Sequence, residues 1–384
     1  MDDLTRLIHS ARIVDDGGET TGAWVLVEHG RVAARGVGDG WHDAAARSDE
    51  IIDARDAAGP GAVLTPGFID IHGHGGGGAA HDDGVEAIRA ARELHRAHGT
   101  TRSVISLVTA GIDDLAERVS RIAELADADT TILGSHLEGP FLDPGHHGAH
   151  DPRLLIDPTP AAVDRLLEAG RGTVRQITIA PELPGALAAI ERIAAAGAAA
   201  AVGHTDADAD VTRRAFDAGA TILTHAFNAM RGLHHRAPGP IGAATGDERV
   251  TLEVIADGVH LDPEIVRIAF AAAPGRIALV TDAMAAAGSA DGAYLLGALE
   301  VRVDAGVARL GDGTIAGSTL TQDAALRTAV AAGIALTDAV AALTATPARA
   351  IGRTDLGTLA VGAPADAVLL DGDLRVHRVW TGRA

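Results

Sequence analysis

The feature that most constrains the fold is an alternation of short apolar runs with longer amphipathic stretches between residues 65 and 354. Most runs precede a stretch in which apolar residues recur every three or four positions, as in GVEAIRAARELHRAHG. Eight such repeats match the length of a parallel (β/α)8 TIM barrel, about 250 residues plus insertions. The eight strand-like runs are LTPGFIDIH, TTRSVISLVT, TILGSHLEG, RQITIAPE, AAAAVGH, ATILTHAF, VTLEVIADG and RIALVTDA.

The two ends of the chain have a different pattern. Residues 1–64 alternate apolar and polar positions, and AWVLVEHGRVAARG places a Gly turn between two strand-like runs, which predicts a hairpin. Residues 355–384 are similar, and neither end has enough short strands to bury a core alone. We therefore expect an α/β protein with two domains: a small β-sandwich domain from 1–64 and 355–384, and the barrel over 65–354.

A doubly wound open sheet is the alternative for such a repeat. That fold would need a Gly-rich phosphate turn after its first strand. The segment HGHGGGG that follows the first run is not G-x-G-x-x-G in register with a helix start, and it contains two His that such a turn does not need. The sequence therefore favours the closed barrel.

Composition excludes several kinds of chemistry. The net charge of −20 argues against nucleic acid or an anionic membrane as a partner. The chain contains neither Cys nor Lys, which excludes disulfides, thiolate ligands, Schiff bases and a lysine carbamate that bridges two metal ions. No apolar run approaches about 18 residues, and the first residues lack a signal-peptide pattern, so we expect a cytoplasmic location.

Six residues with metal-ligating side chains follow the predicted strands. Taken singly, each has an ordinary explanation, since an isolated His is usually structural and a strand-end Asp is often a helix N-cap. Together they predict a metal site, because the carboxyl ends of barrel strands meet at one rim. Their N and O donors favour zinc, with Fe, Co and Mn as alternatives. The six are His72 and His74 after the first strand, Glu138 after the third, His204 after the fifth, His225 after the sixth and Asp282 after the eighth.

Other features near these residues have simpler interpretations. The glycines after His74 allow the chain to turn sharply beside an ion, because Gly adopts positive φ freely. Further histidines are expected to be solvated in helices or loops. These are His81, His95, His98, His146 and His147.

The strand-end pattern resembles the amidohydrolase superfamily. Many members bridge two ions with a carboxylated lysine, and a Glu on the third strand replaces it here. The segments HLEGPFLDPGHHGAH, THAFNAM, IADGVH, LVTDAM and GTIAGSTLT make the chain similar to the N-acetylglucosamine-6-phosphate deacetylase family over essentially its whole length. Gln322 and Asp323 depart from the apolar residue expected after GSTLT, which leaves details of the sugar pocket open.

This resemblance implies a role for each matching residue. Glu138, His204 and His225 would be the main metal ligands. His72 and His74 would hold a second ion, so that one or two ions bind per subunit. Asp282 would be a further metal ligand and the catalytic acid and base. The remaining residues would contact substrate: His150 the carbonyl of the acetamide, and Asn228, Ala229, Arg236 and His260 the phosphate. The resemblance also implies a homodimer, across whose interface Arg236 and His260 could be contributed.

The implied reaction is hydrolysis of N-acetyl-D-glucosamine 6-phosphate to D-glucosamine 6-phosphate and acetate, within amino sugar metabolism. Three alternatives stay open at this point. One is deacetylation of the galactosamine epimer. Another is an amidohydrolase for a cyclic amide or an N-acyl amino acid. The last is an inactive sugar-phosphate sensor.

Overall fold

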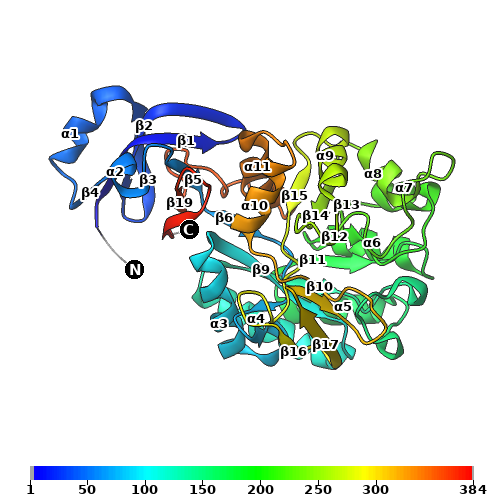
Figure 1. Ribbon diagram of the computed structural model, residues 1–384. Helices are drawn as coiled ribbons and strands as arrows, with labels where there is room; N and C mark the ends of the chain where they lie inside the picture. The colour runs from blue at the N-terminus through cyan, green and yellow to red at the C-terminus, as the bar shows by residue number, and fades with distance from the viewer. Residues whose placement is uncertain (1–3, 383–384) are drawn as a thin grey trace.

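The computed structural model describes residues 4–382 and contains an eight-stranded sheet in which each strand pairs in parallel with the next along the chain. The sheet curls into a barrel with helices outside it (Figure 1). The predicted (β/α)8 fold is confirmed. The barrel strands are β6 (Phe68–Asp70), β9 (Thr100–Val108), β10 (Ile132–Glu138), β11 (Val174–Ile179), β12 (Ala199–Val202), β13 (Ala220–Leu223), β14 (Thr251–Val254) and β15 (Ile277–Leu279).

The outer helices turn one apolar face toward the barrel. In α3 the buried residues Ile88, Ala91 and His95 share one face at three- and four-residue spacing. Asp208 begins α7 by accepting hydrogen bonds from two backbone N–H groups of the first turn. The barrel helices are α3 (Val85–Ala97), α4 (Ile112–Ala128), α5 (Pro160–Gly170), α6 (Ala186–Ala195), α7 (Ala209–Asp217), α8 (Gly239–Thr245), α9 (Pro263–Ala272), α10 (Gln322–Ala331), α11 (Leu336–Leu343) and α12 (Ala345–Ala350).

The barrel closes between its first and last strands through a few specific bonds. No strand ladder joins β6 to β15 within residues 4–382. Instead, the N–H of Asp282 donates to the carbonyl of His72 at 2.8 Å, and the Thr281 hydroxyl donates to Asp70 Oδ2 at 2.6 Å. The side-chain amide of Gln322 donates to backbone carbonyls of both strands. Polar side chains therefore hold the two strand ends that carry the predicted ligands.

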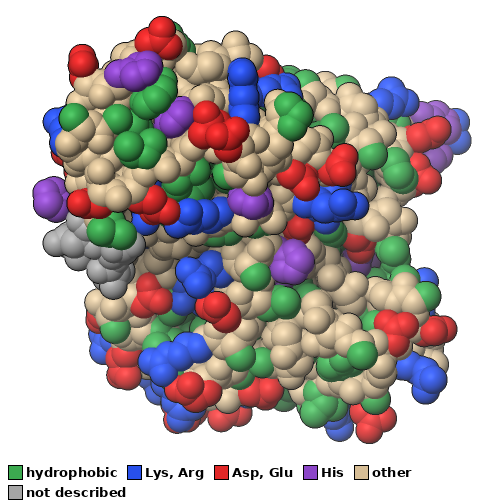
Figure 2. Space-filling model, turned by 60° about the vertical axis from the view of Figure 1, so that its left-hand side comes forward, with side chains coloured by type: hydrophobic (Ala, Val, Ile, Leu, Met, Phe, Trp, Pro, Cys, Tyr) green, Lys and Arg blue, Asp and Glu red, His purple; other side chains and the backbone are tan. Residues whose placement is uncertain are grey.

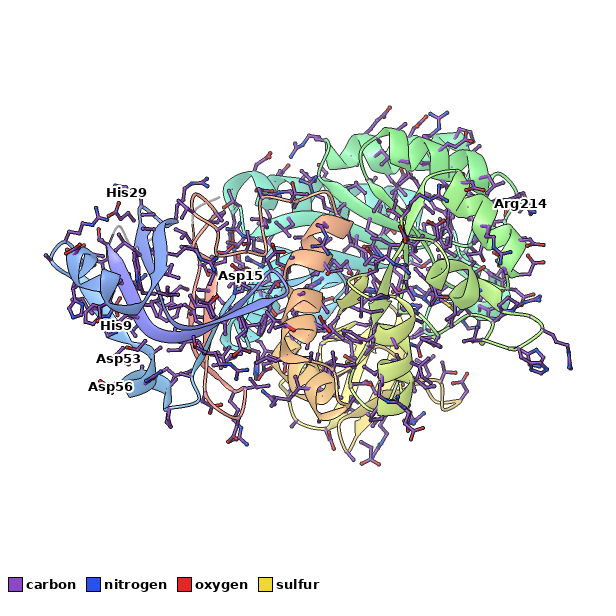
Figure 3. All side chains as sticks on the ribbon, turned by 90° about the horizontal axis from the view of Figure 1, so that it is seen from above. His9, Asp15, His29, Asp53, Asp56 and Arg214 are labelled. Carbon is purple, nitrogen blue, oxygen red and sulfur yellow. The ribbon has the colours of Figure 1, made fainter. Side chains whose placement is uncertain are left out.

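A second sheet combines both ends of the chain. It has seven strands in the order β20-β19-β5-β1-β2-β3, with β4 paired to β1. The hairpin predicted from AWVLVEHGRVAARG is confirmed as the antiparallel pair β2–β3. In Figure 3, His9 and Asp53 lie in this sheet, at the opposite end of the molecule from Arg214. The elements are β1 (Arg6–Asp15), β2 (Gly18–Glu28), β3 (Arg31–Val37), α1 (Trp41–Ala45), β4 (Glu50–Asp53), α2 (Ala54–Ala58), β5 (Val63–Pro66), β19 (Ala367–Leu370) and β20 (Val376–Trp380).

The first predicted strand is divided between the two sheets. Residues 63–66 form β5, which pairs with β1 and β19 in the terminal sheet, and only 68–70 enter the barrel as β6. Gly67 separates the two strands, and a Cβ there would lie 2.2 Å from the Thr101 hydroxyl oxygen. The apolar pattern continues through the junction because both sheets bury this segment.

An antiparallel three-stranded sheet follows β15 and was not among the predicted elements. It packs on the barrel through an apolar cluster that includes Val108, Met284 and Val301. Its strands are β16 (Gly292–Leu296), β17 (Leu299–Asp304) and β18 (Val307–Arg309), and a further short pair is β7 (Gly75–Gly76) with β8 (Ala79–Ala80).

The surface agrees with the acidic composition. On the face shown in Figure 2, arginine side chains lie among Asp and Glu side chains rather than in a continuous basic area. Within the described residues, no helix is both long and apolar enough to cross a membrane.

Candidate metal centre and active site

The six predicted ligands meet at the carboxyl ends of the barrel strands. We call them the rim cluster: His72, His74, Glu138, His204, His225 and Asp282. Glu138 is the last residue of its strand, and the others lie two to four residues beyond theirs. His72 and His74 lie in the loop that follows β6, because this strand ends at Asp70. All six are buried, none more than 8% exposed.

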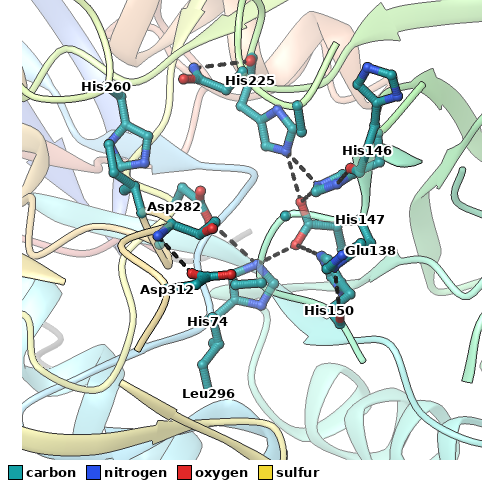
Figure 4. Close-up of a pocket in the computed structure, with 18 of the residues that line it drawn as sticks. His74, Glu138, His146, His147, His150, His225, His260, Asp282, Leu296 and Asp312 are labelled. Carbon is teal, nitrogen blue, oxygen red and sulfur yellow. Dashed lines mark hydrogen bonds and ion pairs between the residues drawn. The ribbon is translucent and has the colours of Figure 1, made fainter. Parts of the chain in front are cut away.

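The ligand atoms form two groups that share Glu138. In the first, the Nε2 atoms of His204 and His225 each lie 3.1 Å from Glu138 Oε1 and 2.9 Å from each other. Figure 4 shows contacts converging on the Glu138 carboxylate.

The second group brings the two histidines after β6 to Glu138 and Asp282. His74 Nε2 lies 3.0 Å from Glu138 Oε2 and 3.4 Å from Asp282 Oδ1. His72 Nε2 lies 3.3 Å from Glu138 Oε1 and 3.5 Å from Asp282 Oδ1. Each oxygen of Glu138 therefore faces imidazole nitrogens, and the carboxylate can bridge two ions.

In His72 and His204, a hydrogen bond from Nδ1 determines that the other ring nitrogen, Nε2, faces Glu138. His72 Nδ1 lies 2.9 Å from Glu253 Oε2, and His204 Nδ1 lies 2.8 Å from the carbonyl oxygen of His146. Since a carboxylate and a carbonyl only accept, both Nδ1 atoms carry the proton. A neutral ring then directs the lone pair of Nε2 toward Glu138.

Lone pairs and carboxylate oxygens packed this closely repel one another unless a positive charge lies between them. The donor set, imidazole nitrogens and carboxylate oxygens with no sulfur, suits zinc or another first-row divalent ion. The residues present therefore fit the ion that the strand-end pattern predicts.

Several residues of this rim have a strained backbone. His204, His225 and Asp282 have φ of 48°, 26° and 47°, in the left-handed region that non-Gly residues rarely adopt. Ala229 is also left-handed, with φ of 48°. Such conformations cost on the order of 1–3 kcal/mol each and persist where the surroundings hold them. The fold thus stabilises a geometry that serves the site rather than the local chain.

The electrostatics of the cluster favour an ionised Glu138. Burial opposes its charge, but the imidazoles of His72 and His150 hold the pKa of Glu138 well below its usual range. Burial likewise disfavours a charged His72, yet the carboxylates of Glu138, Glu253 and Asp282 raise the pKa of that ring. The carboxylate that both groups share is therefore available as an anionic ligand.

His150 lies against the same carboxylate. The backbone N–H of Thr109 donates to His150 Nδ1 at 3.4 Å, so Nε2 carries the proton, 3.3 Å from Glu138 Oε2. Burial lowers the pKa of His150 to about 4, despite the opposing effect of Glu138. A neutral imidazole with its N–H directed into the pocket can donate to a carbonyl oxygen.

The rim cluster opens into a pocket of about 430 Å³. His260 lines this pocket, and its Nδ1 lies 2.7 Å from Asp257 Oδ2. Burial lowers the pKa of His260, but the stronger combined effect of Asp257 and other carboxylates raises it, so the ring offers a positive charge. Predicted residues in the lining are His74, Glu138, His150, His204, His225, Asn228, Ala229, His260 and Asp282. Unpredicted residues there include Gly145, His146, His147, Gly148, Leu296, Asp312, Thr314, Ile315 and Gly317.

Arg236 is not brought to this pocket. It is exposed and borders a separate depression of about 400 Å³ beside Arg213 and Arg231. It belongs to residues 231–238, which we call the arm, a turn between β13 and α8 at the edge of the barrel (Figure 1). Within one chain, then, the structure places Arg236 apart from the other predicted phosphate contacts.

Some sequence interpretations were wrong. His81 and His95 are not solvated but buried, 5% and 8% exposed. His95 Nε2 donates to the carbonyl of Gly75 at 2.9 Å and so supports the glycine-rich turn. A Cβ on Gly76 would lie 2.8 Å from this ring, so close packing requires Gly there, whereas Gly77 and Gly78 have positive φ.

Gln322 and Asp323 are not part of the sugar pocket either. Gln322 bonds at the seam between β6 and β15, and Asp323 accepts from Thr321 and Arg327 at the start of α10. Their departure from an apolar pattern therefore concerns closure of the barrel. Asp257 was also missed, although its place three residues before His260 is visible in IADGVH.

The family of the chain follows from a match of residues 63–382 to the model of the amidohydrolase family. One relative, N-acetylgalactosamine-6-phosphate deacetylase of Escherichia coli O157:H7, is 39% identical over 83% of this chain and 86% of its own. Another, N-acetylglucosamine-6-phosphate deacetylase of Bos taurus, is 36% identical over 83% of this chain and 82% of its own.

Solved structures agree with these relatives. N-acetyl-D-glucosamine-6-phosphate deacetylase of Mycobacterium smegmatis, an Asp-to-Ala variant in complex with N-acetyl-D-glucosamine-6-phosphate, superimposes with a TM-score of 0.92 at 46% identity over 98% of both chains. The N-acetylglucosamine-6-phosphate deacetylase of Thermotoga maritima gives 0.86 at 30% identity, again over 98% of both chains. With its rim cluster of buried His, Glu and Asp ligands, this chain belongs to the amidohydrolase family.

Proposed function

We propose that this protein hydrolyses the acetamide of N-acetyl-D-glucosamine 6-phosphate to D-glucosamine 6-phosphate and acetate. The observation that carries the proposal is the arrangement around Glu138, where a metal-ligating carboxylate, the N–H of His150 and the carboxylate of Asp282 border one pocket. The relatives and solved structures named above support an amino-sugar phosphate as the substrate.

The chemistry needs an activated water and a polarised carbonyl. A divalent ion at the rim cluster supplies both when it is bound, because it lowers the pKa of a water ligand and withdraws electrons from a carbonyl oxygen. Asp282 accepts a proton from the attacking water. His150 donates its Nε2–H to the oxygen that gains negative charge. Asp282 then delivers the proton to the departing amine, which releases the amino sugar and acetate.

The phosphate needs positive groups in an otherwise acidic protein. His260 offers a cation on the wall of the pocket, which Asn228 and Ala229 also line. Arg236 borders a separate depression and does not line the same pocket. We therefore propose that it acts in the pocket of a second copy of the chain. Leu233 on the same arm is 54% exposed, and a homodimer contact would cover this apolar side chain.

Zinc as the native ion, a cytoplasmic location and the homodimer are parts of this proposal. The galactosamine epimer is the second candidate substrate, since one of the relatives acts on N-acetylgalactosamine 6-phosphate by name. The inactive sensor and the amidohydrolase for other amides are less well supported, because the rim cluster is complete and the relatives named above are deacetylases.

An acetate-release assay tests the proposal. Phosphorylated and free N-acetylglucosamine and N-acetylgalactosamine would be compared with the same protein sample, whose metal content is measured by mass spectrometry. We expect the fastest release from N-acetylglucosamine 6-phosphate. A faster reaction with the galactosamine epimer would favour the second candidate, and absence of acetate release from all four by metal-loaded protein would refute the proposal.

A further inference from the structure

Beneath the rim cluster lies a fully buried carboxylate, Glu253 in β14, which no motif of the sequence singled out. Both of its oxygens are bonded. Oε2 accepts from His72 Nδ1 at 2.9 Å and from the backbone N–H of His225 at 3.2 Å. Oε1 accepts from the Gln176 side chain at 2.7 Å. One carboxylate thus supports a residue from each group of ligands.

We propose that Glu253 is a positioning residue that allows the protein to hold two divalent ions rather than one. It would fix the tautomer of His72 and supply negative charge beside the second ion. The inference rests on the proposed metal-dependent function, and it extends that function by assigning the ion count to a residue outside the ligand set.

The tautomer argument comes from geometry. If the proton of His72 were on Nε2, the ring could not offer a lone pair to an ion beside Glu138. The bond to Glu253 keeps the proton on Nδ1. The edge of the ring also packs on His136, with 4.6 Å between centroids, and Ser106 and Thr178 hold His136 in turn. The ring therefore has little freedom to turn away.

The charge argument comes from counting carboxylates. Glu138 and Asp282 bring two negative charges to a site that would contain four positive charges with two ions. Glu253 brings a third, and its full burial preserves the Coulomb attraction that water would screen. Because it contacts the side chain of His72 but only the backbone of His225, its loss should weaken mainly the ion held with His72.

The isosteric variant Glu253→Gln is the direct test. Gln176 Oε1 has no hydrogen-bond partner, so a flipped Gln176 can accept from the new amide and the variant can fold. The amide oxygen then still accepts from His72 Nδ1, so this variant removes the charge of Glu253 and keeps the tautomer. Metal-free protein would be titrated with Zn²⁺ and its stoichiometry read by native mass spectrometry. We expect two ions in the wild type, and in the variant one ion bound normally while the other binds about 10–100-fold more weakly.

A double-mutant cycle with His72→Ala separates positioning from general damage. If Glu253 acts through His72, the double variant binds Zn²⁺ no more weakly than His72→Ala alone. Glu300→Gln, an exposed carboxylate on β17, is the matched control and should bind as the wild type does.

A separate measurement on the wild type needs no variant. The ¹⁵N spectrum of the zinc-loaded protein should show a protonated Nδ1 and an unprotonated Nε2 on His72. A single ion in the wild type, normal binding of the second ion by Glu253→Gln, or a His72 that keeps its proton on Nε2 in the zinc-loaded protein would each overturn the proposal. None of these outcomes bears on acetate release, so failure of this inference is distinguishable from failure of the proposed function.

Discussion

The rim cluster and the arm differ in how much of the protein holds each in place. The six ligands of the rim cluster are buried, and most of their bonding partners come from other strands of the barrel. The arm has one antiparallel bridge, between His234 and Ala237, and exposes Leu233 and Arg236. The interior of the barrel therefore holds the rim cluster, whereas surface contacts such as the ion pair between Arg231 and Asp206 hold the arm.

This difference has a physical reason. Attack on an amide requires reacting groups placed within a few tenths of an ångström, and only a packed scaffold supplies that stiffness. A phosphate is held by charge and tolerates looser positioning. The following experiments test whether chemistry and recognition are divided between the two regions in this way.

The largest effect is expected in the rim cluster. Asp282→Asn should lower kcat by at least about 10³-fold, because no other group in the proposed mechanism moves the proton, while KM changes little. Steady-state acetate release at saturating substrate measures this. Glu300→Gln serves again as the control, and more than a few percent of wild-type turnover in Asp282→Asn would show that the role assigned to it is wrong.

A change in the arm should affect recognition instead of chemistry. Arg236→Ala should raise KM for N-acetylglucosamine 6-phosphate about 10–100-fold through loss of a charge-assisted pair, and leave the unphosphorylated sugar unaffected. Equal effects on the two sugars would contradict the phosphate role.

Mixing two variant chains tests whether Arg236 acts on its own pocket or on that of a partner chain. If Arg236 acts across a dimer, a chain with Asp282→Asn and a chain with Arg236→Ala together restore one intact pocket per mixed dimer. Activity above the sum of the separate proteins supports that arrangement, and simple addition indicates that each Arg236 serves its own chain.

Arg102 is expected to affect stability rather than recognition of the substrate. Arg102 is fully buried, and its Nε donates to Asp366 at 2.5 Å while Nη1 donates to the carbonyl of Thr130, which ties β9 to the segment before β19 and to the loop before β10. Arg102→Leu should lower the free energy of unfolding by about 3 kcal/mol because Asp366 is left unpaired. Urea denaturation measures this, and a double variant with Asp366→Leu should lose less.

The smallest effect is expected at acid pH, away from the pocket. Burial opposes ionisation of Asp323, but bonds from His98, Thr321 and Arg327 lower its pKa. A lowered folded-state pKa contributes stability above the unfolded value, near 4, that is lost as the pH falls below it. Between pH 5 and pH 3, Asp323→Asn should lose about 1 kcal/mol less unfolding free energy than the wild type, and equal losses would show that Asp323 does not contribute.

Much of the site could be predicted because barrel topology converts sequence order into spatial proximity. Once eight strands are recognised, a His or Asp just after a strand has one place to lie, as His204 and Asp282 do. Glu253 was invisible to this argument, since it lies inside β14 in the apolar run TLEVIA and its partner His72 is 181 residues away.

Other features depend on interactions that local patterns do not encode. The apolar run through Gly67 is buried on both sides of the junction, so periodicity could not divide it between two sheets. His81 lies in the polar segment HDD yet is buried, whereas the burial of His95 could have been found from its place on the apolar face of α3 with Ile88 and Ala91. The position of Arg236 relative to a phosphate depends on a partner, and a single sequence contains no direct record of it.

The closure of the barrel at β6 and β15 also has a consequence for synthesis of the protein. Glu138, His204 and His225 come from the middle of the chain, so their half of the centre can assemble before the last barrel strand has left the ribosome. His72 and His74 must wait for Asp282, more than two hundred residues later. We expect the seam strands of a nascent chain to dock last.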